Sequence, residues 1–189
     1  VEEKQQVAMS RGGRAWRGWF PLGGELTSGA PDLKEGFYFG DELPPGDSRP
    51  MHGPNLFPQG ELREVVLAYI AAQRALGQRI MSMLAESLGL SSDFFISGLT
   101  RSPLSLFRIF HYPAPRDARE SGGWGVGEHT DYGLLTILKQ DDCGGLEVKT
   151  PSGWVDAPPE PGTFVCNLGD MLDRMTGGRY RSTPHRVRN

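Results

Sequence analysis

Two histidines and one aspartate in this sequence have the residue types and the spacing of a metal site. His129 and Asp131 are separated by a single residue, and His185 lies much further along the chain. Two imidazoles and one carboxylate can occupy one face of an octahedral divalent ion and leave the opposite face open for substrate and O2. These ligand types suit Fe(II), Zn(II) and Mn(II), although the sequence has no His-Glu-x-x-His motif of a zinc hydrolase. The pattern therefore predicts metal chemistry and leaves the metal open.

The three side chains can meet only if separate parts of the chain carry them to one place. The run from Tyr132 to Gln140 is rich in Leu, Ile and Thr, which is typical of a strand. Side chains two residues apart in an extended chain point to the same side, so His129 and Asp131 can reach one ion together. His185 then has to come from another strand. The alternative is a turn entering a strand, in which Asp131 only bonds to nearby backbone.

The remaining histidines, His52 and His111, are not expected to bind the metal. Three ligands already complete the facial set. His52 lies in Met51-His-Gly-Pro, which is typical of a loop, and His111 alternates with Tyr112 along an expected strand.

The composition is that of one globular domain. The chain has 189 residues, 38% of them hydrophobic, and a formal net charge of −3. This length is enough for a core, and the charge gives no reason to expect binding to nucleic acid or to an anionic membrane surface. No apolar run approaches the roughly 20 residues of a membrane helix, and the polar N-terminus lacks a signal-peptide core. The two cysteines form no CxxC motif, so we expect reduced thiols and a cytoplasmic location.

The first 100 residues are predicted to be an irregular segment followed by one long helix. Gly, Pro, Asp and Ser recur every few residues up to about residue 60. From Glu61 to Leu88 the apolar residues fall at a spacing of three to four, which predicts a helix that supports a sheet, with Gly89 at its end. A second short helix is expected to begin at Ser91 or Ser92.

After residue 100 the pattern changes to short strands separated by turns. The expected strands are 104–112, 133–140, 145–149, 153–156, 163–168 and 184–189. Short strands with regular turn signals are typical of a sandwich or barrel. A short helical connection is expected between Met171 and Gly178. The predicted fold class is therefore mainly β with helices (α+β).

Four ordered blocks make this sequence resemble a known family. They are His-Thr-Asp-Tyr-Gly-Leu-Leu-Thr-Ile-Leu (129–138), Gly-Gly-Leu-Glu-Val (144–148), Pro-Gly-Thr-Phe-Val-Cys-Asn-Leu-Gly-Asp-Met-Leu (161–172) and Gly-Arg-Tyr-Arg-Ser-Thr-Pro-His-Arg-Val (178–187). Together they resemble the isopenicillin-N-synthase-like branch of the Fe(II)/2-oxoglutarate-dependent oxygenases. The resemblance is close from Leu104 to Asn189 and looser in residues 32–40 and 53–58.

The resemblance implies a double-stranded β-helix, or jelly-roll, at residues 101–189, with residues 1–100 as part of the same domain. Rigid strands at the mouth of a jelly-roll can hold ligands from distant parts of the chain. Family members also have strands before the region matching Trp16–Phe39, and an Arg-x-Ser strand and a helix after the second histidine. This sequence has neither, so we expect the chain to be truncated at both ends.

The resemblance also implies an enzyme, a non-haem Fe(II)-dependent dioxygenase. Such an enzyme uses 2-oxoglutarate and O2, with ascorbate as a further candidate cofactor. It oxidises a small molecule by hydroxylation, desaturation or cyclisation and releases succinate and CO2. Two alternatives share the fold: an iron oxidase that does not use 2-oxoglutarate or that forms ethylene, and a non-catalytic metal-binding jelly-roll. The sequence does not define the substrate or the oligomeric state.

By the same resemblance, the catalytic metal ligands are His129, Asp131 and His185, and Tyr112 contacts 2-oxoglutarate. A phenol can donate one hydrogen bond to a carboxylate while its ring packs beside the chain. The position two before Tyr112 is Phe110, where plant members have Asn. The polar contact that this Asn would make is therefore not carried over.

The remaining candidates belong to the substrate side of the site and to its support. Arg108 is expected on the same strand face as Tyr112, where it could bind a substrate anion or pair with an acidic residue. Asn167 and Asp170 are expected mainly as turn and supporting residues. Candidate apolar walls, for which ordinary core packing is the alternative, are Leu134, Leu146 and Phe164.

Overall fold

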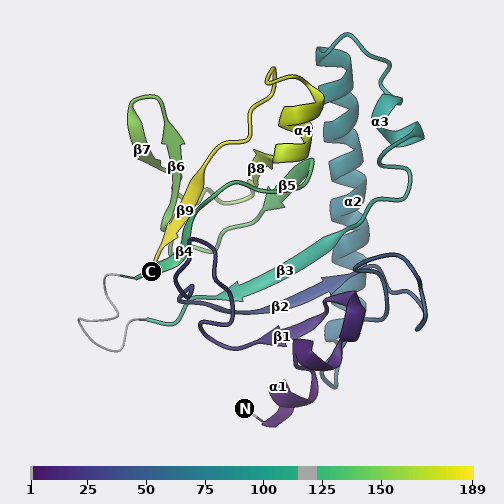
Figure 1. Cartoon of the computed structure of the whole chain (residues 1–189), viewed down its shortest axis with the longest axis vertical. Coiled ribbons are helices and arrows are strands. Elements are labelled where there is room, and N and C mark those ends of the chain that lie inside the picture. The colour runs from purple at the N-terminus through teal and green to yellow at the C-terminus, as the bar shows by residue number, and fades with distance from the viewer. Residues whose placement is uncertain (1, 115–122) are drawn as a thin grey trace. The chain divides into compact units, whose positions relative to one another are not determined.

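The computed structural model describes residues 2–114 and 123–189, which fold into two compact units that alternate along the sequence (Figure 1). The first unit comprises Val1–Phe20 and Gly36–Phe110, and the second comprises Pro21–Glu35 and His111–Asn189. The early segment 21–35 therefore folds with the C-terminal half of the chain.

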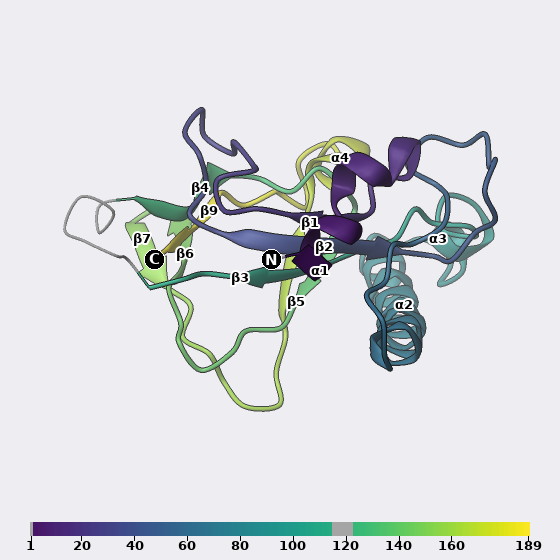
Figure 2. The ribbon, with the colours of Figure 1, turned by 90° about the horizontal axis from the view of Figure 1, so that it is seen from below.

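The first unit contains a three-stranded sheet in the order β1-β2-β3. The strands are β1 (Gly18–Phe20), β2 (Glu35–Gly40) and β3 (Leu106–His111), and α1 (Glu2–Gln6) and two 3-10 turns precede them. Strands β1 and β2 pair antiparallel, and both views show the three strands side by side (Figures 1 and 2). The structure thus corrects the expectation that the first 60 residues are irregular. The run Gly-Phe-Tyr-Phe within β2 has the aromatic residues that favour a half-buried strand.

The long helix α2 (Leu62–Ser87) lies within one residue of its predicted bounds at each end. Its buried residues Val66 and Ile70 pack against Phe39 of β2, and this contact forms the core of the first unit. Partly buried hydrophobic side chains surround that core: Phe37, Phe57, Leu62 and Phe107. A short helix, α3 (Phe94–Ser97), follows slightly later than predicted. Among the described helices, none has the length and apolar character needed to cross a membrane.

The second unit contains two antiparallel sheets. One has the order β4-β9-β6-β7 and the other pairs β5 with β8. The first sheet consists of β4 (Trp124–His129), β9 (His185–Arg188), β6 (Leu146–Thr150) and β7 (Gly153–Asp156). The second consists of β5 (Leu135–Leu138) and β8 (Val165–Leu168), and the short helix α4 (Asp170–Met175) follows β8 as expected.

Among the strands of the second unit, β4 is the one that the sequence analysis did not predict. Its sequence, Trp-Gly-Val-Gly-Glu-His, contains two glycines, which have low strand propensity and mask the pattern. This segment forms a strand because it pairs with β9, which lies far along the chain. The strand expected at residues 133–140 runs only from Leu135 to Leu138, and Asp131 lies in the loop between β4 and β5.

Candidate metal centre

The pairing of β4 with β9 brings two of the three predicted ligands face to face. His129 ends β4, His185 begins β9, and the two residues are register partners. Their imidazole ring centroids lie 4.3 Å apart. The register of β4 is irregular between Val126 and His129, which is typical of a bulge that redirects a side chain at the end of a strand.

The third predicted ligand reaches the same place from the loop after β4. Asp131 Oδ1 lies 3.9 Å from His129 Nε2 and 3.8 Å from His185 Nε2. The carboxylate of Asp131 therefore faces both imidazole rings.

Backbone carbonyls select the same tautomer for both imidazoles. His129 Nδ1–H donates to Gly127 O at 2.8 Å, and His185 Nδ1–H donates to Thr183 O at 3.0 Å. A carbonyl oxygen only accepts, so Nδ1 carries the proton in each neutral ring and Nε2 carries a lone pair. Both Nε2 atoms are the ones nearest Asp131. This arrangement orients metal-binding histidines through a hydrogen bond on the opposite ring nitrogen.

The loop that carries Asp131 is held by β8 and by the two residues that follow it. Asp170 N–H donates to Asp131 O at 2.7 Å, and Asn167 Nδ2 donates to Asp131 Oδ2 over a longer 3.4 Å. Gly169 is packed so closely that a Cβ atom there would lie 2.1 Å from Gly133 O and 2.9 Å from Asp131 O. These contacts hold the backbone carbonyl and the Oδ2 atom of Asp131 and agree with the supporting role predicted for Asn167 and Asp170.

The fit of a divalent ion follows from these distances. One ligand atom from each of the three residues can be chosen so that all lie within 4.8 Å of one another. Ligands about 2.1 Å from an ion and at right angles are about 3 Å apart, so small side-chain adjustments close the set. The exposed side-chain fractions are 25% for His129, 9% for Asp131 and 7% for His185. Within the described part of the chain, these residues form the one such group of His, Cys, Asp and Glu.

Comparison with known proteins identifies the family of this chain. The profile of the 2OG-Fe(II) oxygenase superfamily matches residues 103–189, and that of the non-haem dioxygenase in morphine synthesis N-terminal region matches residues 1–60. The chain belongs to the 2OG-Fe(II) oxygenase superfamily. The family predicted from the four sequence blocks is thereby confirmed.

Curated relatives of the superfamily align along nearly the whole chain. A probable iron/ascorbate oxidoreductase of Dictyostelium discoideum is 49% identical over 211 residues, which cover 97% of this chain and 58% of that protein. A homoarginine-6-hydroxylase of Oryza sativa is 40% identical over 199 residues, which cover 100% of this chain and 60% of that protein. The chain thus spans about three fifths of the length of these relatives.

Solved oxygenase structures share the fold. A full-length Neurospora crassa protein in complex with alpha-KG superposes with a TM-score of 0.85 at 32% identity, covering 100% of this chain and 60% of that one. JOX2 in complex with 2OG, Fe and JA superposes with a TM-score of 0.77 at 28% identity, covering 99% of this chain and 54% of that one. The predicted jelly-roll fold class is therefore confirmed.

The structure places Tyr112 against the strand that carries His129. Tyr112 is half-buried just after β3, and a Cβ atom at Gly125 would lie 2.8 Å from its ring. The absence of a side chain at Gly125 therefore lets the phenol ring pack on the β4 backbone. The role of Tyr112 in binding 2-oxoglutarate stays a prediction of the superfamily resemblance.

Arg108 lies in the first unit, on β3. Its guanidinium group lies over the rings of Tyr38 and Phe110, with centroid distances of 5.8 Å and 5.4 Å. Such cation–π contacts orient an exposed arginine along its strand. Substrate binding by Arg108 stays a prediction.

The three predicted apolar wall residues have different environments. Leu146 is 4% exposed within the four-stranded sheet, which favours core packing for it. Leu134 is half-buried, and its carbonyl oxygen accepts a hydrogen bond from Gly169 N–H. Phe164 is 37% exposed. Phe164 therefore has the most surface to offer to a ligand, and its role stays a prediction.

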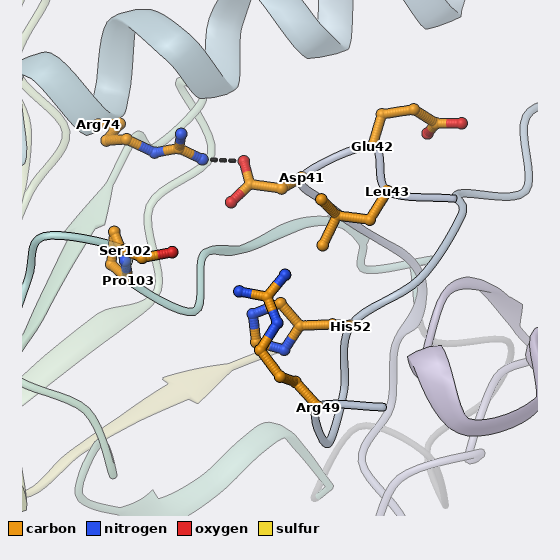
Figure 3. Close-up of a pocket in the computed structure, with 8 residues that line it drawn as sticks. All are labelled: Asp41, Glu42, Leu43, Arg49, His52, Arg74, Ser102 and Pro103. Atoms are coloured by element: carbon orange, nitrogen blue, oxygen red, sulfur yellow. Dashed lines mark hydrogen bonds and ion pairs between the residues drawn. The ribbon is translucent and has the colours of Figure 1, made fainter. Parts of the chain in front are cut away.

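The two other histidines lie outside the metal group, as expected. His111 Nδ1 lies 3.0 Å from Glu35 Oε1. His52 lines a pocket of about 340 Å³ in the first unit, where Arg74 reaches Asp41 (Figure 3). The described residues of that pocket include carboxylates and one histidine but not a converging set of three ligands.

Some residues that support the metal ligands cannot be identified from their residue type. Gly127 and Thr183 act through backbone carbonyls, which every residue carries. Their only available signal is position, because each lies two residues before a ligand histidine.

Proposed function

We propose that the protein is a non-haem Fe(II)- and 2-oxoglutarate-dependent oxygenase that oxidises a small molecule. The observation that carries this proposal is the convergence of His129 Nε2, His185 Nε2 and Asp131 Oδ1, with both rings held in the tautomer that binds metal. Two neutral imidazoles and one carboxylate match the ligand preference of Fe(II) and leave coordination positions open.

The bound iron, with 2-oxoglutarate and O2, would supply the oxidising chemistry, and succinate and CO2 would be released. The chain's own residues would hold the ion and orient the groups around it. His185 and Asp131 are nearly buried, so they would exclude water from one side of the ion, whereas the more exposed His129 edge leaves access.

Tyr112 is the proposed contact to 2-oxoglutarate within this chain. Replacing it by Phe removes the hydroxyl and keeps the ring that packs on Gly125. We expect Tyr112→Phe to weaken 2-oxoglutarate binding by about 0.5–1.5 kcal/mol, the usual net value of one hydrogen bond. Isothermal titration of the Fe(II)-loaded protein measures this change. An effect on substrate affinity alone would contradict the assignment.

A second candidate is an iron oxidase that does not consume 2-oxoglutarate. Another relative, the 1-aminocyclopropane-1-carboxylate oxidase of Dictyostelium mucoroides, favours it, with 38% identity over 225 residues that cover 100% of this chain and 61% of that protein. Its name describes an oxidase and not a hydroxylase.

An anaerobic titration separates the two candidates. Metal-free protein receives Fe(II) and then 2-oxoglutarate, and visible absorption is followed after each addition. A new charge-transfer band that requires both additions, and that is lost in His185→Ala, is the expected result. Iron binding without this band would favour the second candidate. A folded sample that binds no iron would overturn both.

A further inference from the structure

A pair of buried charges lies in the early segment of the second unit. Asp32 and Lys34 are each 2% exposed, and Lys34 Nζ lies 2.6 Å from Asp32 Oδ2. Lys34 Nζ also lies 2.9 Å from Glu25 Oε2, and Thr27 Oγ1–H donates to Asp32 Oδ2. Asp32 and Lys34 lie in a stretch that resembles the superfamily, but neither residue belongs to the metal triad.

Burial of such a pair needs a reason other than stability. The cost of removing two charges from water offsets most of their mutual attraction, and a well-packed apolar pair is often equally stable. A buried ion pair can instead fix a segment in one register, because its partners cannot be exchanged for water at low cost.

The segment that carries the pair docks on the strand that carries His129. Leu33 N–H donates to Trp124 O at 3.0 Å, and Gly127 N–H donates to Asp32 Oδ1 over a longer 3.4 Å. The fit is close at Gly127, where a Cβ atom would lie 2.0 Å from Ser28 Oγ. Three contacts of different kinds therefore hold the backbone of β4 between residues 124 and 127.

Gly127 connects this docking to the metal site. Its N–H donates to Asp32, and its carbonyl oxygen accepts the Nδ1–H of His129 at 2.8 Å. A shift of Gly127 would move the acceptor that selects the His129 tautomer. Outer hydrogen-bond partners of this kind typically change metal affinity by about 10–100-fold when they are removed.

We propose that Asp32 and Lys34 are positioning residues for the metal ligand His129. The buried pair holds segment 21–35 against β4, so that Gly127 O keeps the imidazole in its Nδ1–H form with Nε2 directed at the ion. This inference rests on the proposed function only in that the triad binds a divalent metal.

The test uses Co(II) as a spectroscopic probe of the whole chain, with visible absorption as the readout. We expect Asp32→Ala to lower Co(II) affinity about 10–100-fold in protein that remains folded by circular dichroism. Lys34 keeps Glu25 as a partner in this variant, which limits the destabilisation. Asp32→Asn keeps an acceptor for Gly127 N–H but loses the ion pair with Lys34, so its Co(II) affinity is expected to lie between those of Asp32→Ala and the wild-type protein.

A matched control breaks a different ion pair in the same unit. Glu147 is 11% exposed in its side chain and pairs with Arg186 at 2.7 Å in the four-stranded sheet. Glu147→Gln is expected to leave Co(II) affinity unchanged. An equal loss in Glu147→Gln would show general destabilisation and overturn the positioning role.

A second readout does not depend on metal. The imidazole ¹⁵N shifts of His129 in metal-free protein report which nitrogen carries the proton, and Asp32→Ala is expected to mix the two tautomers. A folded Asp32→Ala variant with wild-type Co(II) affinity and wild-type ¹⁵N shifts would overturn the inference.

If Asp32→Ala does not fold, the milder Thr27→Val variant takes its place, because it removes one hydrogen bond to Asp32. Unchanged ¹⁵N shifts of His129 in Thr27→Val would overturn the inference. Wild-type protein that binds no Co(II) would instead contradict the proposed function, and the shifts would still test the positioning.

Discussion

The metal triad of the second unit and the polar pocket of the first unit both gather histidine and acidic side chains, but they use them differently. In the pocket, the lining residues Arg74 and Asp41 pair with each other, and Arg49, which also lines the pocket, pairs at 2.6 Å with Asp47 beside it. Hydrogen bonds from Arg49 hold the pKa of Asp47 well below its usual range. In the triad, backbone carbonyls take up the Nδ1–H groups and both Nε2 atoms point to one carboxylate.

The difference shows that residue type alone does not make a metal site. Carboxylates that already face arginines have their charge balanced within the protein, so an added cation gains little. Two neutral imidazoles beside one carboxylate leave a negative charge and two lone pairs directed at one point. Orientation by the backbone is what separates the two regions.

Removal of a ligand is the strongest way to test this contrast. We expect Asp131→Ala or His185→Ala to weaken Fe(II) or Co(II) binding by more than the roughly 10–100-fold that loss of a supporting group costs. Equilibrium dialysis measures the affinity, and circular dichroism checks the fold. His52→Ala, the matched histidine of the pocket, is expected to have no effect. Comparable losses of metal affinity in all three variants would show that the pocket and the triad do not differ in metal binding.

A pair of glycine substitutions tests whether backbone packing supports the aspartate. In Gly169→Ala the new Cβ would lie 2.1 Å from Gly133 O, whereas a Cβ at Gly133 meets no atom within 4 Å. We expect Gly169→Ala to lower the free energy of unfolding by about 1–3 kcal/mol, because the backbone around Asp131 must move. We also expect it to weaken Co(II) binding about tenfold or more. Gly133→Ala should change the free energy of unfolding by no more than about 0.5 kcal/mol. Urea denaturation measures the free energy of unfolding of both variants, and titration measures their Co(II) affinity. Equal values for the two variants would show that close packing at Gly169 does not support Asp131.

The smallest effect is expected in the pocket. Arg74 and Asp41 have side chains 33% and 27% exposed, so solvent screens their attraction. Arg74→Met keeps much of the aliphatic stem and should lower the free energy of unfolding by about 0–1 kcal/mol. Chemical denaturation measures this value. Metal affinity is expected to stay unchanged in this variant, and a loss of affinity would show that the pocket and the triad are coupled.

The sequence predicted the elements with strong local patterns. Helix α2 was predictable because its apolar spacing continues from Leu62 to Leu88, and β6 and β7 were predictable from flanking turns. Strand β9 was expected because His185 has to come from a strand other than that of His129 and Asp131. Strand β4 was not, because Gly125 and Gly127 weaken its propensity and its order comes from β9.

The candidate site shows the same division. The types and spacing of His129, Asp131 and His185 were sufficient to nominate them, and the structure brings all three together. The contacts that hold the loop at Asp131 and the tautomers of the two histidines were not predictable, because they depend on carbonyl and amide positions set by tertiary contacts. The roles of Tyr112, Arg108 and Phe164 stay predictions.

The alternation of the two units along the chain has a consequence for biosynthesis. Segment 21–35 leaves the ribosome early, but its docking partner, Trp124–Gly127, emerges about one hundred residues later. At about 5–20 residues per second, Asp32 and Lys34 wait on the order of ten seconds before they can be buried together against β4. Contacts this distant in sequence slow folding, so the second unit is expected to complete its metal site only after synthesis passes His185.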